Sequence, residues 1–177
     1  MSTTKWTLDP THSELNFKVK HLMISNVKGE FTAFTSSIEA TDDNFNDATI
    51  EASIDTASIF TNNTDRDNHL KSADFFETEV YPIITFTSTG FTQKSGDDYV
   101  MTGAITIKDI TLPISIDVEF GGINQDPWGN TKAGFSFDTK INRKDFGLTW
   151  NAALETGGVM VSDEVKIFGE VQFVKQA

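Results

Sequence analysis

Residues 112–120 have the sequence Leu-Pro-Ile-Ser-Ile-Asp-Val-Glu-Phe, in which every second residue is apolar. Successive side chains of an extended chain point to opposite faces of a sheet, so this period of two predicts a strand with one dry face and one wet face. Pro113 stands early in the stretch, where a strand tolerates the missing N–H donor. The stretch therefore predicts a half-buried strand.

The same alternation recurs, with varying strength, in seven other stretches, at residues 15–19, 28–39, 48–54, 83–91, 98–108, 133–141 and 165–173. Together the patterns predict eight strands. Two architectures fit them: a two-sheet sandwich, or an up-and-down antiparallel barrel that has no edge strands. A barrel of eight strands either fills its interior with side chains or holds one small ligand there, and the pattern alone leaves both options open.

Two stretches break the alternation. Thr64 and Asp67 have the spacing of a capping box, and apolar residues follow at helical spacing, so we expect a short helix near 65–74 with Thr64 as its N-cap. A second irregular segment is expected at about 145–162. The chain has no internal repeat, linker or low-complexity tract, and residues 1–177 are therefore predicted to form a single domain.

The composition agrees with an all-β fold and excludes several functions. The chain has 15 Ile and 10 Val against 7 Leu, with 23 Thr, 15 Phe and no cysteine, and β-branched and aromatic residues favour strands. Its net charge of −12 and lack of any Lys/Arg run argue against nucleic-acid binding and a polybasic membrane anchor. No stretch approaches the ~18 apolar residues of a membrane span, so we expect no stable membrane insertion. The polar start predicts a cytoplasmic protein, or a periplasmic one if a signal peptide has been removed.

Few residues suggest catalysis. The three histidines, His12, His21 and His69, fit no common metal-binding spacing. The chain also contains no GxSxG, GxGxxG or P-loop motif. We therefore predict no catalytic residue, no metal and no cofactor. A metal-assisted or lipid-modifying hydrolase that uses the three histidines is kept as an alternative.

An ordered set of short motifs along the chain resembles the YceI family of lipid-binding proteins. The set includes Trp6, Leu8-Asp9-Pro10, His12-Ser13, Val27-Lys28-Gly29, His69-Leu70, Asp74-Phe75-Phe76, Tyr81-Pro82, Asn142-Arg143, Asp145-Phe146-Gly147-Leu148 and Trp150. The resemblance implies a lipocalin-like eight-stranded antiparallel barrel. It also implies an elongated apolar cavity for polyisoprenoid chains, isoprenoid quinones or related fatty lipids. Many members of the family are exported to the periplasm.

We therefore predict a protein that binds, transports or stores a long apolar lipid without catalysis. Expected to line the cavity are Phe17, Val19, Phe31, Ile50, Ile54, Phe86, Ile105, Phe135, Phe137, Phe146, Trp150 and Ile167. Expected at its polar end are His12, His21, His69, Asn142 and Arg143. A homodimer is a further expectation. A second alternative is an interaction module whose core is filled.

Overall fold

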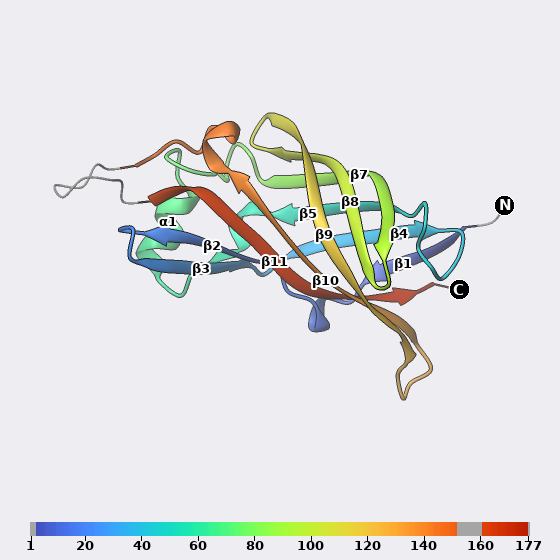
Figure 1. Ribbon diagram of the computed structural model, residues 1–177. Helices are drawn as coiled ribbons and strands as arrows, with labels where there is room; N and C mark the ends of the chain where they lie inside the picture. Colours follow the sequence, from blue (N-terminus) through green and yellow to red (C-terminus); the bar gives the residue numbers. More distant parts are fainter. Residues whose placement is uncertain (1–2, 152–160, 177) are drawn as a thin grey trace.

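The computed structural model of the protein describes residues 3–151 and 161–176 (Figure 1). Part of the irregular segment expected at 145–162, residues 152–160, lies outside this range. Within it, no helix is long and apolar enough to cross a membrane. The elements are β1 (Thr4–Leu8), η1 (Pro10–His12), β2 (Asn16–His21), β3 (Ser25–Phe31), β4 (Phe34–Ala40), β5 (Thr49–Asp55), η2 (Thr56–Ser58), β6 (Ile59–Phe60), α1 (Thr64–Lys71), β7 (Ile83–Ser95), β8 (Asp98–Ile107), β9 (Ile110–Gln125), β10 (Thr131–Asn142), η3 (Arg143–Phe146) and β11 (Val161–Lys175).

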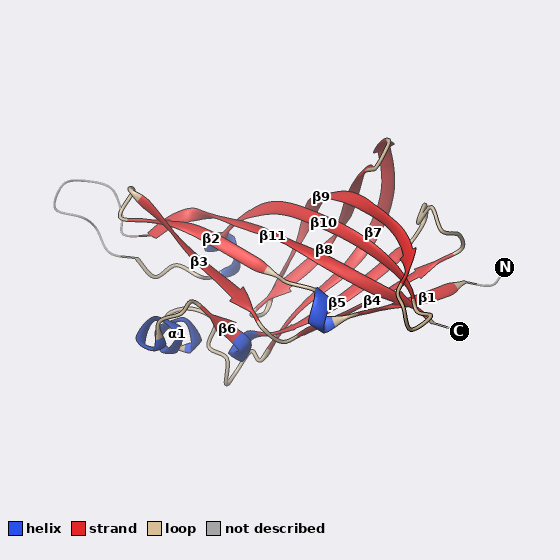
Figure 2. Ribbon diagram, turned by 90° about the horizontal axis from the view of Figure 1, so that it is seen from below, coloured by secondary structure: helices blue, strands red, loops and turns tan. Residues whose placement is uncertain are grey.

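Eight of the described strands close into an antiparallel barrel in the order β1-β4-β5-β7-β8-β9-β10-β11, and the pairing of β1 with β11 completes the ring. Figure 2 shows the ring from a second direction. The predicted eight-stranded antiparallel barrel is thus confirmed. Closure leaves each ring strand with two partners, which explains how a chain rich in β-branched residues avoids long exposed strand edges.

The barrel wall contains interrupted strands. Both β1 and β2 run along β11, β1 beside its C-terminal part and β2 beside its N-terminal part, with η1 between them. In the same way a short break separates β3 from β4, and η2 separates β5 from β6. At the end of the barrel that contains β2 and β3, the described part of β6 pairs with β3 alone, and α1 lies beside it.

Two predictions at the N-terminal half need correction. Strand β1 was not predicted, because its five residues contain one fully buried side chain, Trp6, and give no visible alternation. The stretch at 28–39 forms two strands, β3 and β4, with Thr32 and Ala33 exposed between them. The break shifts the inward positions from Phe31 to Phe34, which is why the alternation in this stretch is weak.

The predicted helix is present as α1, but its cap differs from the prediction. The side chain of Asn63 accepts a hydrogen bond from the Arg66 N–H at 3.0 Å, so Asn63 is the N-cap and Thr64 is the first helical residue. Asp67 is buried and binds Thr61 instead of completing a capping box. The helix ends at Lys71, three residues earlier than expected.

Candidate functional site

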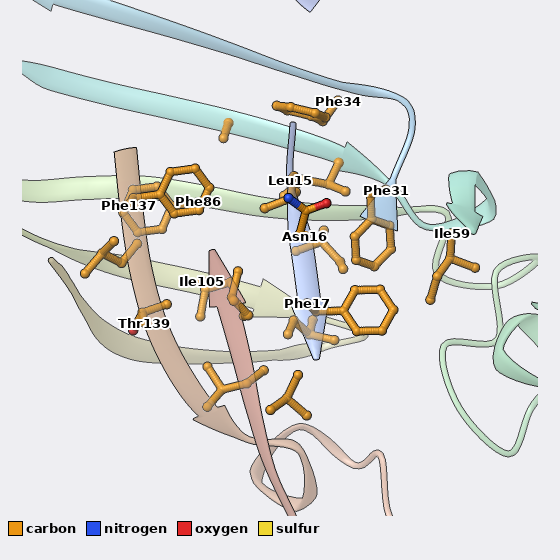
Figure 3. A pocket seen from close by; sticks show the side chains of 18 of the residues that line it. Leu15, Asn16, Phe17, Phe31, Phe34, Ile59, Phe86, Ile105, Phe137 and Thr139 are labelled. Atoms are coloured by element: carbon orange, nitrogen blue, oxygen red, sulfur yellow. The ribbon is translucent and has the colours of Figure 1, made fainter. Parts of the chain in front are cut away.

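The barrel encloses a cavity of about 620 Å³, within the range of roughly 300–1,000 Å³ that is typical of small-ligand pockets. All eight ring strands line it, together with β2, β3, β6 and α1. The wall is mostly Ile, Phe, Val and Leu, and Figure 3 shows Phe17, Phe86 and Phe137 around the space. The alternative of a filled core is therefore wrong for this interior.

Three glycines in the wall explain why so many phenylalanines leave the interior hollow. Gly29, Gly103 and Gly169 each lie beneath the ring of a phenylalanine on a neighbouring strand, respectively Phe17, Phe86 and Phe137. A methyl group added to Gly103 would lie 2.6 Å from Cζ of Phe86, and one added to Gly169 would lie 3.0 Å from Cζ of Phe137. The rings occupy the volume of the missing side chains, so they lie along the wall and not across the lumen.

One end of the cavity is closed by aromatic side chains. Phe45, in the connection between β4 and β5, is almost fully buried, and its ring centroid lies 5.3 Å from that of Trp6 and 5.1 Å from that of Phe135. Tyr99 donates its hydroxyl to the carbonyl of Asn44 at 2.9 Å, which ties this connection to β8. Burial raises the pKa of Tyr99, and the carboxylates of Asp97 and Asp42 add to this effect. This end is dry and tightly packed.

The opposite end is next to α1 and reaches solvent, because the exposed lining residues Lys20, Asn63 and Asp65 belong to it. We call this end the mouth. The ring of His69 packs edge-on against Trp150, with centroids 4.7 Å apart, and against Phe75 at 5.1 Å. The mouth therefore combines aromatic side chains with most of the polar lining.

A short hydrogen-bond network anchors α1 at the mouth. The backbone N–H and the hydroxyl of Thr61 both donate to Oδ1 of Asp67, at 2.8 and 2.5 Å. The guanidinium of Arg66 donates to the hydroxyl oxygen and the carbonyl of Thr61, at 2.8 and 2.7 Å. The network joins the first two turns of the helix to the end of β6 and positions Arg66 beside the cavity.

Arg143 also lines the cavity, yet its guanidinium serves the backbone. It donates to the carbonyls of Leu148 at 2.6 Å, Trp150 at 2.8 Å, Ser162 at 2.9 Å and Val161 at 3.3 Å. Its side chain is 3% exposed. Burial lowers the pKa of Arg143, and the carboxylate of Asp163, 4.0 Å away, opposes this shift. The residue fastens the segment after η3 to the start of β11.

The structure places most of the predicted apolar residues on the cavity wall. These are Phe17, Val19, Phe31, Ile50, Ile54, Phe86, Ile105, Phe135, Phe137, Trp150 and Ile167. Phe146 is the exception. It is buried in η3 and borders an outer groove between β9, β10 and β11, because η3 turns it away from the lumen. Contact of the eleven residues with a ligand stays a prediction.

The predicted polar residues divide into two groups. His21, His69 and Arg143 line the cavity. His12 does not: it lies in the exposed turn η1, with Nδ1 2.8 Å from Oδ2 of Asp9. Asn142 does not either, because its side chain caps η3 by accepting the Lys144 N–H. The described residues contain no group of three or more His, Asp or Glu that could hold a metal. The three-histidine centre that the hydrolase alternative needs is therefore not formed by these side chains.

Several lining residues were missed. Thr139 faces the lumen, and its hydroxyl donates to the carbonyl of Ser115 at 2.7 Å, where β9 and β10 stop pairing (Figure 3). Arg66 and Phe45 come from a helix and a loop, where alternation gives no signal. Ile116 and Val118 belong to a face that was predicted dry but was not assigned to the cavity.

Comparison with known proteins gives concordant results. A family model described as YceI-like domain matches residues 6–173. A UPF0312 protein of Staphylococcus aureus is 42% identical over 171 residues, which cover 96% of this chain and 97% of the relative. The crystal structure of a Campylobacter jejuni YCEI protein has a TM-score of 0.76 at 34% identity and covers 89% of this chain and 90% of that one. A polyisoprenoid binding domain from Saccharophagus degradans has a TM-score of 0.72 over 97% of this chain and 98% of its own. At 16% sequence identity, this structural similarity shows a shared fold alone.

Proposed function

This chain belongs to the YceI-like family, and on that premise we propose that it binds a long apolar lipid, an isoprenoid chain or an isoprenoid quinone, inside the barrel. The observation that carries the proposal is the cavity of about 620 Å³, whose wall is almost wholly apolar. The description of the Saccharophagus degradans neighbour as a polyisoprenoid binding domain supports the choice of ligand class.

The shape of the site suggests how the lipid is oriented. Each CH₂ group buried from water contributes about 0.8 kcal/mol, so a long chain binds firmly without specific polar contacts. Around Phe45, at the closed end, the described side chains that line the cavity are aromatic or aliphatic. The mouth offers His21, Asn63 and Arg66. We therefore place the tail of the lipid at the closed end and its head group at the mouth.

We further propose that the protein transports or stores the lipid and does not transform it. Several polar groups at or beside the mouth are held by contacts within the fold: Asp67 binds Thr61, Arg66 binds Thr61, and His69 Nε2 lies 2.9 Å from Oδ2 of Asp74. Side chains held in this way are suited to orient a head group. The predicted homodimer and cytoplasmic location stay predictions.

Organic extraction of gently purified protein, followed by mass spectrometry, tests the proposal. We expect a lipid with an isoprenoid chain, and we expect lipid-free protein to take up an isoprenoid quinone. Protein that yields no lipid and takes up neither quinone nor fatty acid would contradict the proposal.

A matched pair of variants makes the test specific to the cavity. Ala52 on β5 lines the lumen. Ala104 on β8 faces away from the lumen, because it alternates with the inward-facing Ile105. Ala52→Phe should fill part of the cavity and reduce quinone uptake, while Ala104→Phe should leave uptake unchanged. Equal uptake by both variants would show that the lipid binds elsewhere.

A further inference from the structure

The hairpin formed by β2 and β3 ends in an exposed apolar turn at the mouth end of the barrel. Met23 is 51% exposed and Ile24 is 82% exposed. In both Figure 1 and Figure 2 this turn lies at the same end of the molecule as α1, opposite the two termini. His21, which directly precedes the turn, lines the cavity. Apolar side chains are thus presented to solvent beside the opening of the cavity.

The turn has an unusual residue choice for its backbone. Leu22 and Met23 both have positive φ values, 54° and 63°. Hairpin turns with two such residues are normally made of Asn and Gly, which tolerate this conformation. Here the same positions hold large apolar side chains, so the turn displays hydrophobic surface where a polar turn would fold more easily.

The outer face of the same hairpin carries lysines that continue onto neighbouring strands. In the antiparallel ladders Lys140 is directly opposite Lys166, Lys166 is opposite Lys18, and Lys18 is opposite Lys28. We call these four residues the lysine row; they lie on β10, β11, β2 and β3. Like charges placed directly opposite each other destabilise a sheet, so the row is unfavourable in the isolated protein.

Among the described residues, the neighbouring acids leave most of the row without an ion pair. Glu30, Asp138 and Glu164 are adjacent in the ladders, and Asp117 and Asp145 line the outer groove that Lys18, Lys140 and Lys166 also line. Of the row, Lys140 alone forms an ion pair within the described part of the chain, with Glu164 at 4.0 Å. Residues 16–31 contain three lysines and one glutamate, a net charge of +2 in a chain whose net charge is −12. The hairpin is therefore a basic element on an acidic protein.

We propose that this face docks reversibly on an anionic lipid bilayer, with the turn at Met23 and Ile24 inserted among the head groups and the lysine row held against their charge. Apolar tips flanked by basic residues bind such interfaces in this way. The row lies about four residues, or about 14 Å, from the turn. This exceeds the screening length of about 8 Å at physiological salt, so the barrel must lie tilted, with β2, β3, β10 and β11 toward the membrane. The mouth then adjoins the bilayer.

Vesicle flotation tests the proposal. We expect the protein to float with vesicles of phosphatidylcholine mixed with phosphatidylglycerol, to stay free with phosphatidylcholine alone, and to lose binding as salt rises from about 0.01 to about 1 M. Lys18→Glu with Lys28→Glu should weaken binding more than about tenfold. Met23→Asn with Ile24→Ser should also weaken it, and Asn suits the positive φ at position 23. Absence of binding to the anionic vesicles would overturn the proposal.

Three control variants test whether the lysine row and the apolar turn themselves carry the binding. Lys5→Glu with Lys94→Glu changes the net charge equally. Trp128→Ser removes an 83% exposed apolar residue from the turn between β9 and β10, and this turn lies at the opposite end of the barrel (Figure 1). Both variants should bind vesicles like the parent protein. If they lost as much binding as the lysine-row and turn variants, overall charge or hydrophobicity would account for the binding, and the proposed face would not. Ala52→Phe, which fills part of the cavity, should also still bind the vesicles. A loss of vesicle binding in this variant would mean that the protein binds by taking lipid into its cavity and not by docking on the surface. Lysine-row-dependent binding to polyglutamate without binding to vesicles would identify a protein-docking surface and overturn the membrane assignment.

Discussion

Phe17 on β2 is the direct ladder partner of Gly29 on β3, and its ring covers the glycine from the inside of the barrel. The same relationship joins Phe137 on β10 to Gly169 on β11. Because each ring fills the space of an absent side chain, the large residues of the wall do not meet in the middle. The hollow interior thus depends on pairs of residues on different strands.

Gly29→Ala should shrink the cavity without unfolding the protein. The atoms nearest to the new methyl group belong to the side chains of Phe17 and Thr61, so the ring of Phe17 can rotate into the empty lumen. We expect reduced quinone uptake, with a loss of unfolding free energy below the ~1–3 kcal/mol of overpacking in a filled core. Uptake is followed by extraction and unfolding by urea titration.

Gly169→Ala provides the contrast. Its new methyl group would collide with the backbone carbonyl of Glu14, which cannot rotate away. The free energy of unfolding should fall by about 1–3 kcal/mol or more. Equal stability of the two variants would contradict the proposed packing.

Trp150→Ala should speed the release of a bound lipid. The indole ring packs against His69 and Phe75 at the mouth, at centroid distances of 4.7 and 5.6 Å. Aromatic pairs contribute about 0.5–1.5 kcal/mol each, so the loss of both should raise the release rate about tenfold. Stopped-flow displacement of a fluorescent fatty acid measures this rate. Trp128→Ala, at the distant turn between β9 and β10, should release the probe at the parental rate.

Arg143→Lys should be strongly destabilising although it keeps the charge. Four backbone carbonyls share the guanidinium, and the three donors of an ammonium group cannot reproduce its planar geometry. We expect the free energy of unfolding to fall by about 3 kcal/mol or more, since each unpaired buried acceptor costs about 1–3 kcal/mol. In the same urea titration Lys144→Met, which removes an exposed ion pair with Asp163, should change it by less than about 1 kcal/mol.

The stability of the protein should fall in acid through Asp9. The ammonium of Lys132, 2.6 Å from Oδ2 of Asp9, holds the pKa of this carboxyl well below its usual range, and His12 and Thr11 add to the effect. A depressed folded-state pKa stabilises the fold above the unfolded-state pKa of about 3.9. That contribution is lost as the pH falls below about 4 toward the folded-state value.

Asp9→Asn should therefore lower the free energy of unfolding at neutral pH by about 1–3 kcal/mol and should flatten its decline below about pH 4. Thermal unfolding followed at a series of pH values checks both effects. Asp109→Asn, at an exposed carboxylate in the turn between β8 and β9 with no ion pair among the described residues, should leave the pH profile unchanged. An unaltered profile in the Asp9 variant would show that its pairing with Lys132 is not a stabilising one.

Residues within the regular strands were the predictable part of the site. Ile50 and Ile54, or Phe135 and Phe137, share a face because side chains alternate along any strand, and the cavity requires nothing more of them. The errors lie where the chain leaves a strand. His12 and Phe146 lie in the short turns η1 and η3, and Asn142 ends β10 as the N-cap of η3. At such positions the direction of a side chain follows from local hydrogen bonds that no period describes.

The sequence by itself determined the β class, the dry and wet face of most strands, the presence of a short helix and the family, because these depend on neighbouring residues or on the order of motifs. Only the tertiary structure decided that the interior is hollow, since this requires Phe17 to lie over Gly29. It also decided that Lys18, Lys28, Lys140 and Lys166 form one row, although no basic run exists in the chain. The register between strands sets both features, and register arises from pairing across the barrel and not from any local pattern.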